Sequence, residues 1–288
     1  INRDKTTGIG ALTEDNGVID IGFASIRFGI KGNFNSILEV LHDNVGLKKV
    51  QEIVDVASRQ EGPWKLAMKD LKLTAPIPRP GKILGAALNY HDFCERGNLS
   101  TPTSLKVFSK LSTTVVGPDD EVKIPRDRTV TYEGELGIII GKRGKEVSSM
   151  NAFDFIAGYT IINDFTANDY IKEDVQLMRG KNLDTFCPMG PVFVTKDEIP
   201  DPEKLYIVTK VNGFIRQNSN TSQLIFKIPY MIEYFSSFLT LEPGDVIATG
   251  TPAGTALQFD PPAFVKQGDV VTVSVEGIGT LVNRIINP

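Results

Sequence analysis

The sequence predicts a mixed α/β, β-rich protein in which a small N-terminal α+β domain precedes a larger strand-rich domain. Short β-branched and aromatic runs recur from residue 82 onward, separated by turns rich in glycine and proline. Helical patterns are few in that part, which favours a rolled or sandwich-like sheet over a doubly wound one. The proline-rich residues 75–81 can hold neither a helix nor a central strand. We therefore interpret them as the linker, with domains at residues 1–75 and 76–288.

Composition narrows the class of protein. The chain has 288 residues, a net charge of −4 and a pI near 5.4, which argues against a nucleic-acid-binding surface. No apolar run approaches the length that a membrane span needs. Cys94 and Cys187 form neither a disulfide framework nor a zinc pattern, so a reducing compartment is expected. We predict the cytoplasm, or the mitochondrion if a targeting segment precedes Ile1.

The elements of the first domain follow from local signals. Residues 8–28 are expected to form short hairpin-like strands, broken by Asp15-Asn16-Gly17 and by Gly22. Asn35-Ser36 should begin a helix with apolar residues on one side. Two further helices are expected over residues 48–57 and 64–71.

The second domain reads mainly as strands. We expect them over residues 82–88, 105–110, 113–116, 136–140, 158–164, 205–211, 214–217, 245–249, 270–275 and 280–286. Asn212-Gly213 is a hairpin turn signal between two of them. A helix-like segment is expected over residues 148–155. The spacing of Ile228, Met231, Ile232, Phe235, Phe238 and Leu239 predicts one amphipathic helix.

Two glutamates open the central strand. Glu133 and Glu135 are two residues apart, and a strand has a side-chain period of two, so both point to the same face. Like charges on a buried face cost desolvation energy unless something neutralises them. A hard divalent cation such as Mg²⁺, Mn²⁺ or Ca²⁺ would do so through carboxylate oxygens. The alternative is a polar strand end with both glutamates in solvent.

A third carboxylate ends the next strand. Asp164 follows the run Gly158-Tyr159-Thr160-Ile161-Ile162-Asn163, and a strand–helix–strand order can bring it to Glu133 and Glu135. Three carboxylates on one cation leave positions for water and a bidentate substrate, which suits a catalytic metal. Asp164 could instead be a turn aspartate, which is the interpretation we give to Asp169.

Several motifs, in order, resemble the C-terminal domain of the fumarylacetoacetate hydrolase family. They are the Tyr132-Glu133-Gly134-Glu135-Leu136 strand, Asn163-Asp164-Phe165-Thr166-Ala167, Gly180-Lys181-Asn182-Leu183-Asp184 with Cys187-Pro188-Met189-Gly190-Pro191, and Thr249-Gly250-Thr251-Pro252-Ala253-Gly254. Phe108-Ser109-Lys110 and Pro118-Asp119-Asp120-Glu121 fit as well. The likeness spans residues 76–287. Acylpyruvases and oxaloacetate tautomerase-like or decarboxylase-like members are the most similar in pattern.

The resemblance implies a β-roll fold, a homodimer, and Mg²⁺ or Mn²⁺ held by Glu133, Glu135 and Asp164. It also assigns Lys181 and Thr251 to the substrate. A lysine near carboxylates can stabilise an enolate, and the Gly250-Thr251 turn can present a hydroxyl and N–H groups to a carboxylate. Without the resemblance, these would read as a solvated lysine and a turn threonine. Lys110 is a further substrate-binding candidate of the same kind.

Two departures from the family pattern concern catalysis. Relatives commonly carry Asn-Tyr-x-Asp-His-Ala-x-Glu, whose His–Glu pair activates water, but here those two positions are Phe93 and Arg96. Phenylalanine cannot carry a proton, so His91 and Glu95 are the remaining candidates for a base.

The second departure is Asn168, which stands where relatives carry an arginine. The change removes a fixed positive fork for a substrate carboxylate. Asn168 nevertheless remains a substrate-binding candidate.

The favoured hypothesis is a Mg²⁺-dependent hydrolase that cleaves a C–C bond in a 2-oxo or 1,3-dicarbonyl acid, of acylpyruvate or fumarylacetoacetate type, through a metal-stabilised enolate. The alternative is an oxaloacetate decarboxylase or tautomerase (isomerase), which needs no activated water. An alternative of another class is a catalytically silent, metal-binding family member.

Overall fold

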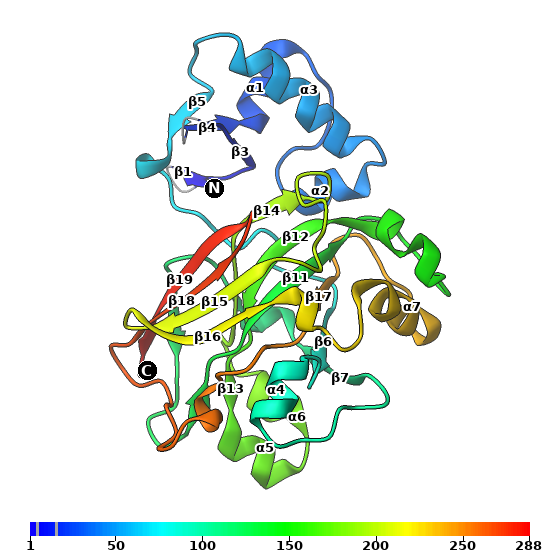
Figure 1. Ribbon diagram of the computed structural model, residues 1–288. Coiled ribbons are helices and arrows are strands. Elements are labelled where there is room, and N and C mark those ends of the chain that lie inside the picture. Colours follow the sequence, from blue (N-terminus) through cyan, green and yellow to red (C-terminus); the bar gives the residue numbers. More distant parts are fainter. Residues whose placement is uncertain (4–5, 15–16) are drawn as a thin grey trace.

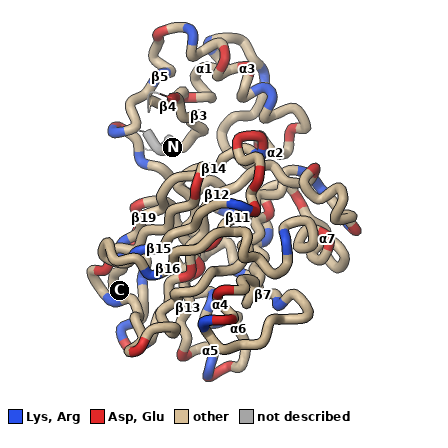
Figure 2. Tube along the Cα trace, viewed as in Figure 1, with Lys and Arg blue, Asp and Glu red and all other residues tan. Residues whose placement is uncertain are grey.

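The structure is a computed structural model that describes residues 1–3, 6–14 and 17–288. A small N-terminal unit lies at one end of a larger β-rich unit (Figure 1). Basic and acidic positions are interspersed over both units along the described trace (Figure 2). Among the described residues, no helix has the length and apolarity that crossing a membrane requires.

The N-terminal unit combines short strands with helices. Its elements are β1 (Asn2–Arg3), β2 (Thr6–Thr7), β3 (Gly10–Leu12), β4 (Gly17–Asp20), α1 (Ile21–Phe28), α2 (Ile37–His42), α3 (Gly46–Ser58), β5 (Lys65–Ala67) and the 3₁₀ helix η1 (Met68–Asp70). Strands β3, β4 and β5 form one antiparallel sheet. The helices expected at Ser36 and over residues 48–57 are confirmed, and Ser36 caps α2 by accepting from the N–H of Glu39. Of the expected Asp15-Asn16-Gly17 turn, the first two residues lie outside the described part of the chain.

Two expectations for this unit are wrong. Residues 21–28 form the helix α1 and not a strand, because Asp20 accepts from the N–H of Phe23 at 2.9 Å and caps the helix. Gly29, with a φ of 72°, ends it. Residues 64–71 form β5 and the short 3₁₀ helix η1, and not one continuous helix. Pairing of β5 with β4 overrides the local propensity, while the buried Trp64 donates its indole N–H to Ala57 O at 3.2 Å.

The segment that we interpreted as a linker holds neither helix nor strand, yet it is packed. Ala75 and Ile77 are buried in one cluster with Leu41 of α2 and Val246 of the larger unit. The N-terminal unit has a separate core that includes Ile19, Ile53 and Trp64. The domain boundary at residues 75/76 stays a prediction.

A seven-stranded sheet in the order β7-β6-β17-β11-β12-β14-β8 forms one layer of the larger unit. Its strands are β6 (Ile83–Ala87), β7 (Lys106–Lys110), β8 (Val115–Val116), β11 (Gly134–Ile140), β12 (Ile156–Asn163), β14 (Cys187–Thr195) and β17 (Val246–Ala248). The antiparallel register pairs Gly134 with Asn163, which sets the start of β11 beside the end of β12. Just beyond these ends, β10 (Val130–Thr131) pairs with β13 (Thr166–Ala167).

A five-stranded sheet in the order β16-β15-β18-β19-β9 packs against the first. Its strands are β9 (Glu121–Lys123), β15 (Tyr206–Val211), β16 (Phe214–Asn220), β18 (Val270–Val275) and β19 (Gly279–Ile286). One core cluster takes residues from both sheets, among them Leu136 and Ile138 of the first and Ile207, Val273 and Leu281 of the second. The predicted mixed, β-rich roll is therefore confirmed, as is the hairpin at Asn212-Gly213.

Helices cover the edges and ends of this roll (Figure 1). They are α4 (His91–Arg96), α5 (Asn168–Asp174), α6 (Leu177–Lys181), α7 (Ile228–Phe238), and the 3₁₀ helices η2 (Ser112–Thr114), η3 (Ser149–Phe155), η4 (Thr221–Gln223) and η5 (Ala256–Gln258). The expected amphipathic helix is α7, which buries Ile228, Met231, Ile232 and Phe235 and packs against η3. Helices α4, α5 and α6 lie at the end of the roll where β11 begins and β12 ends (Figure 1).

Candidate functional site

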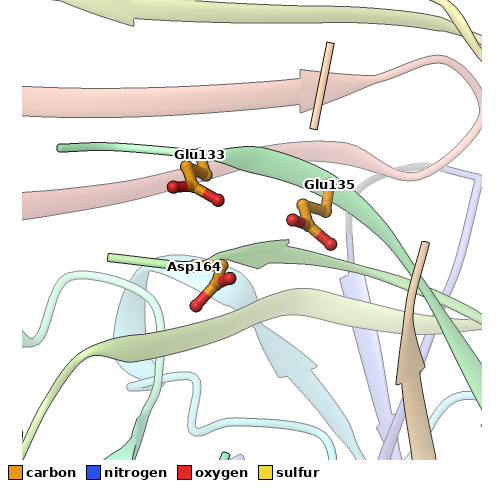
Figure 3. Close-up of side chains that lie close together, drawn as sticks. All are labelled: Glu133, Glu135 and Asp164. Atoms are coloured by element: carbon orange, nitrogen blue, oxygen red, sulfur yellow. The ribbon is translucent and has the colours of Figure 1, made fainter. Parts of the chain in front are cut away.

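Three carboxylates meet where β11 begins and β12 ends (Figure 3). Glu133, Glu135 and Asp164 each offer an oxygen atom, and these oxygens lie within 4.8 Å of one another. The backbone holds the strand ends together, because the N–H of Asp164 donates to Glu133 O at 2.8 Å. Glu135 and Asp164 are buried and Glu133 is largely so. The prediction that the i, i+2 pair and the third acid converge is confirmed.

Two buried lysines partly neutralise this cluster. Lys181 Nζ, at the end of α6, donates to Glu133 Oε2 at 2.8 Å and to Asp164 Oδ2 at 2.5 Å. Lys110 Nζ, at the end of β7, lies 2.6 Å from Asp164 Oδ1 and also donates to the carbonyl oxygen of Lys181. When all five groups are ionised, three carboxylates and two ammonium groups leave one excess negative charge. Lys181 is only 4 % exposed, so it is not a solvated lysine.

Burial and mutual repulsion disturb the protonation of these groups. Burial raises the pKa of Glu135 well above its ordinary value, and the nearby Asp164 and Glu133 raise it further. Burial also raises the pKa of Glu133, against the lowering effect of Lys181. Burial alone would lower the pKa of Lys181, but the three carboxylates outweigh it and raise that pKa.

The residues fit a divalent metal ion. The donor set is three carboxylates, which are the ligands that hard cations such as Mg²⁺ and Mn²⁺ take. Their closest oxygens already lie within 4.8 Å of one another, so small side-chain rotations would bring them to one ion. The excess negative charge that the lysines leave favours a cation at this place.

The Gly250-Thr251 turn lies against the same strand. The N–H of Gly250 donates to Glu135 Oε2 at 2.8 Å, which orients that carboxylate. Thr251 Oγ1 donates to Gly134 O at 3.0 Å and accepts from Gln217 Nε2 at 2.7 Å. The turn that the sequence assigned to the substrate therefore adjoins the metal-binding acids.

Helix α4 presents the candidate bases to solvent. His91 and Glu95 are exposed, and within the described part of the chain neither hydrogen-bonds to the three carboxylates. Phe93, at the position of the family histidine, packs against the apolar core. Arg96, at the position of the family glutamate, donates to Gln258 O at 3.2 Å. The roles of His91 and Glu95 stay predictions.

Asn168 begins α5, and both its side-chain amide and its backbone N–H are hydrogen-bonded to other residues of the protein. Its side-chain amide donates to Thr131 Oγ1 at 2.7 Å, and its backbone N–H donates to Thr129 O at 2.9 Å. These bonds fasten α5 to β10. Its role in substrate binding also stays a prediction.

Sequence reasoning missed three residues of the site. Thr166 Oγ1 donates to Glu133 Oε1 at 3.0 Å, and the ring of Phe108 lies 4.6 Å from Lys181 Nζ. Both stand inside motifs that carried the resemblance, and that was the available signal. Gln217 lies in the polar run Arg216-Gln217-Asn218-Ser219, where nothing distinguishes it from its neighbours.

Comparisons with known proteins agree with this geometry. The chain is 39% identical over 287 residues to oxaloacetate tautomerase YisK of Bacillus subtilis, covering 96% of this chain and 95% of that protein. Among solved structures, fumarylacetoacetate hydrolase from Exiguobacterium antarcticum is 34% identical with a TM-score of 0.82, covering 100% of this chain and 98% of that one. Maleylpyruvate hydrolase from Sphingobium sp. SYK-6, in complex with manganese(II) and pyruvate, is 27% identical with a TM-score of 0.78, covering 98% of each chain.

The family model for the C-terminal domain of fumarylacetoacetate hydrolase matches residues 82–286, which contain all three carboxylates, both buried lysines and the Gly250-Thr251 turn. This match, together with the β-roll and these relatives, shows that the chain shares more with this enzyme family than the shape of its sheets. The chain belongs to the fumarylacetoacetate hydrolase family.

Proposed function

We propose that the protein is a divalent-metal-dependent tautomerase of a short 2-oxo diacid such as oxaloacetate. One observation carries the proposal. Lys181, a cation, contacts Glu133 and Asp164, while Phe93, at the sequence position of the family's water-activating histidine, packs against the apolar core. Such a site suits enolate stabilisation more than hydrolysis. The tautomerase that is 39% identical over nearly the whole chain supports the same choice.

Tautomerisation requires little from the protein. One proton leaves carbon 3 of the keto acid and one reaches the carbonyl oxygen, so no bond to water forms and no carbon–carbon bond breaks. A bound Mg²⁺ or Mn²⁺ would supply Lewis-acid polarisation of adjacent substrate oxygens, and Ca²⁺ could substitute as a ligand-compatible ion. The ligands would be Glu133, Glu135 and Asp164.

The chain's own residues would supply the remaining functions. Lys181 holds a positive charge at the carboxylate cluster and can stabilise negative charge on the enolate oxygen. The turn at Gly250 and Thr251 lies beside Glu135, and it can bind a substrate carboxylate through the backbone N–H of Thr251, since the N–H of Gly250 already donates to Glu135. Lys110, whose side chain is fully buried, partly neutralises Asp164 at a distance of 2.6 Å.

Hydrolysis of a C–C bond is the second candidate, and it is the one that the sequence placed first. The solved maleylpyruvate hydrolase with manganese and pyruvate favours it, because that neighbour shares the fold over 98% of each chain. Water would add to the distal carbonyl and the enolate would leave. Decarboxylation of oxaloacetate would pass through the same enolate with loss of CO₂.

A spectrophotometric assay separates these reactions. We expect oxaloacetate keto–enol exchange to accelerate with Mg²⁺ or Mn²⁺ and to stop when a chelator removes the metal. Acylpyruvate cleavage without accelerated exchange would identify a hydrolase, and pyruvate release from oxaloacetate a decarboxylase. No turnover of any of them, with metal binding intact, would indicate a silent family member.

We further propose that the protein forms a homodimer. The hairpin β15–β16 exposes large apolar side chains, with Tyr206 64%, Phe214 70% and Ile215 58% exposed, and a second copy of the chain would cover them. Light scattering should then give twice the 31.6 kDa of one chain. A mass of 31.6 kDa at micromolar concentration would refute this proposal.

A further inference from the structure

A buried glutamine links the strand that carries the metal-binding glutamates to the Gly250-Thr251 turn. Gln217 lies on β16 of the second sheet and is 0% exposed. Its Oε1 accepts from the N–H of Gly134 at 3.0 Å, and its Nε2 donates to Thr251 Oγ1 at 2.7 Å and to Pro252 O at 2.8 Å. All three hydrogen bonds that the Gln217 side chain makes in the described structure therefore go to the strand start at Gly134 and to the turn at Thr251 and Pro252.

Gly134 is the residue between two of the metal-binding glutamates. Gln217 holds its N–H, and Thr251 Oγ1 donates to its carbonyl oxygen at 3.0 Å. A Cβ at position 134 would lie 2.3 Å from Thr209 Oγ1 and 2.8 Å from Val273 Cγ1, so the second sheet packs directly on this backbone. Gln217 and Thr251 therefore hold the backbone between Glu133 and Glu135, and with it the positions of the two carboxylates.

The same bonds set the direction of the Thr251 hydroxyl. An amide nitrogen can only donate, so Thr251 Oγ1 must accept from Gln217. The single hydroxyl proton then goes to Gly134 O. What remains for a ligand is an acceptor lone pair on Oγ1 and the backbone N–H of Thr251, for which the described residues provide no hydrogen-bond acceptor.

We propose that Gln217 is a positioning residue that couples metal binding to substrate binding by fixing both Gly134 and the Thr251 hydroxyl. In this arrangement, Thr251 binds a substrate carboxylate through its backbone N–H, and its hydroxyl oxygen accepts a hydrogen bond from the O–H of the enol form. The substrate half of this inference rests on the proposed action on a 2-oxo acid. The metal half does not depend on it.

The decisive variant is Gln217→Met, which keeps the length of the side chain and removes all three hydrogen bonds. The matched control is Asn283→Leu. Asn283 is an equally buried amide of the same sheet, and its Nδ2 donates to Gly117 O and Asp120 O, both at 2.9 Å. Both variants lose buried hydrogen bonds and some stability, but Asn283→Leu should leave the affinity for Mg²⁺ and oxalate within twofold of wild type.

Calorimetry with Mg²⁺ measures the effect on metal binding, and calorimetry with oxalate on the Mg²⁺-loaded protein measures the effect on substrate binding separately. Gln217→Met should weaken Mg²⁺ affinity about tenfold through Gly134, and oxalate affinity by a further factor of about ten through Thr251. In a Thr251→Val background, Gln217→Met should still weaken Mg²⁺ affinity but should change oxalate affinity less than threefold, because the hydrogen bond by which Gln217 positions residue 251 and its backbone N–H is already gone.

Two results would overturn the inference. If Gln217→Met and Asn283→Leu differ only in melting temperature, with Mg²⁺ and oxalate affinities unchanged, Gln217 has a purely structural role. If the oxalate effect of Gln217→Met is the same in both Thr251 backgrounds, or if wild type does not bind oxalate, the coupling to substrate is wrong. Failure of the oxaloacetate assay with intact Mg²⁺ and oxalate effects would instead refute the proposed function alone.

Discussion

Replacing Lys181 with methionine would remove a buried positive charge from between two carboxylates. Its Nζ lies 2.8 Å from Glu133 Oε2 and 2.5 Å from Asp164 Oδ2. At an effective dielectric constant of about 20, each contact represents roughly 6–7 kcal/mol of gross Coulomb attraction. Desolvation offsets much of this, and removal of one partner from a buried ion pair usually costs about 3–5 kcal/mol. Without metal, the free energy of unfolding should fall by that amount.

Lys181→Met should lower the stability of the metal-free protein, but it should not lower its affinity for Mg²⁺. With Lys110 alone left, the three carboxylates carry two excess negative charges and not one, so Mg²⁺ should bind at least as tightly as in wild type. Saturating Mg²⁺ should then recover much of the lost stability, since about 100-fold excess over Kd contributes about 2.7 kcal/mol. Activity should nevertheless stay low, because the cation that stabilises the enolate is missing.

Thermal unfolding with and without Mg²⁺ measures both effects. At roughly 2–4 °C per kcal/mol, Lys181→Met should melt about 10 °C below wild type in a chelator, and Mg²⁺ should raise its Tm by at least as much as it raises the Tm of wild type. Lys204→Met is the control, since Lys204 pairs with Asp201 at 2.7 Å on the exposed surface and should leave Tm nearly unchanged. An unchanged Tm for Lys181→Met in chelator, or a loss of Mg²⁺ affinity, would refute the reasoning.

Three further predictions follow from the same geometry. Glu133→Ala, Glu135→Ala or Asp164→Ala should each abolish Mg²⁺ binding and activity while keeping the fold; undiminished affinity in calorimetry would contradict the site. His91→Ala should reduce kcat less than tenfold, because His91 is exposed and makes no hydrogen bond to the three acids of the described site, whereas loss of a true general base would cost about 10²–10⁴-fold. Hydrogen bonds from the backbone N–H and hydroxyl of Thr129 lower the pKa of Asp169, so Asp169→Asn should destabilise the folded protein at neutral pH. Since a lowered pKa stabilises only while the group is ionised, denaturation measurements should show that difference vanishing as the pH falls through the lowered pKa of Asp169.

Much of the fold could be predicted from local pattern. Short apolar runs and turn residues indicate where strands lie, because continuous apolar runs mark fully buried strands such as β11 and β12, and alternation marks half-buried strands such as β18. The pattern failed at residues 21–28 and 64–71. In the first, an aspartate cap at Asp20 made an apolar run helical. In the second, pairing with β4 made a predicted helix into a strand. The Asp20 cap is a local signal that directly precedes the run, whereas the pairing of β5 with β4 depends on a distant segment that a short window does not contain.

The sequence by itself determined the acidic half of the site. Glu133 and Glu135 share a face because a strand has a period of two, and Asp164 ends a strand that lies next to theirs. Only the tertiary structure decided what surrounds them. Lys110 is 54 positions before Asp164 and Gln217 is 83 after Gly134, and each reaches its partner through packing of separate strands and sheets. A buried amide or ammonium is tolerated only where distant chain segments complete its hydrogen bonds, and a local pattern carries no record of that partner.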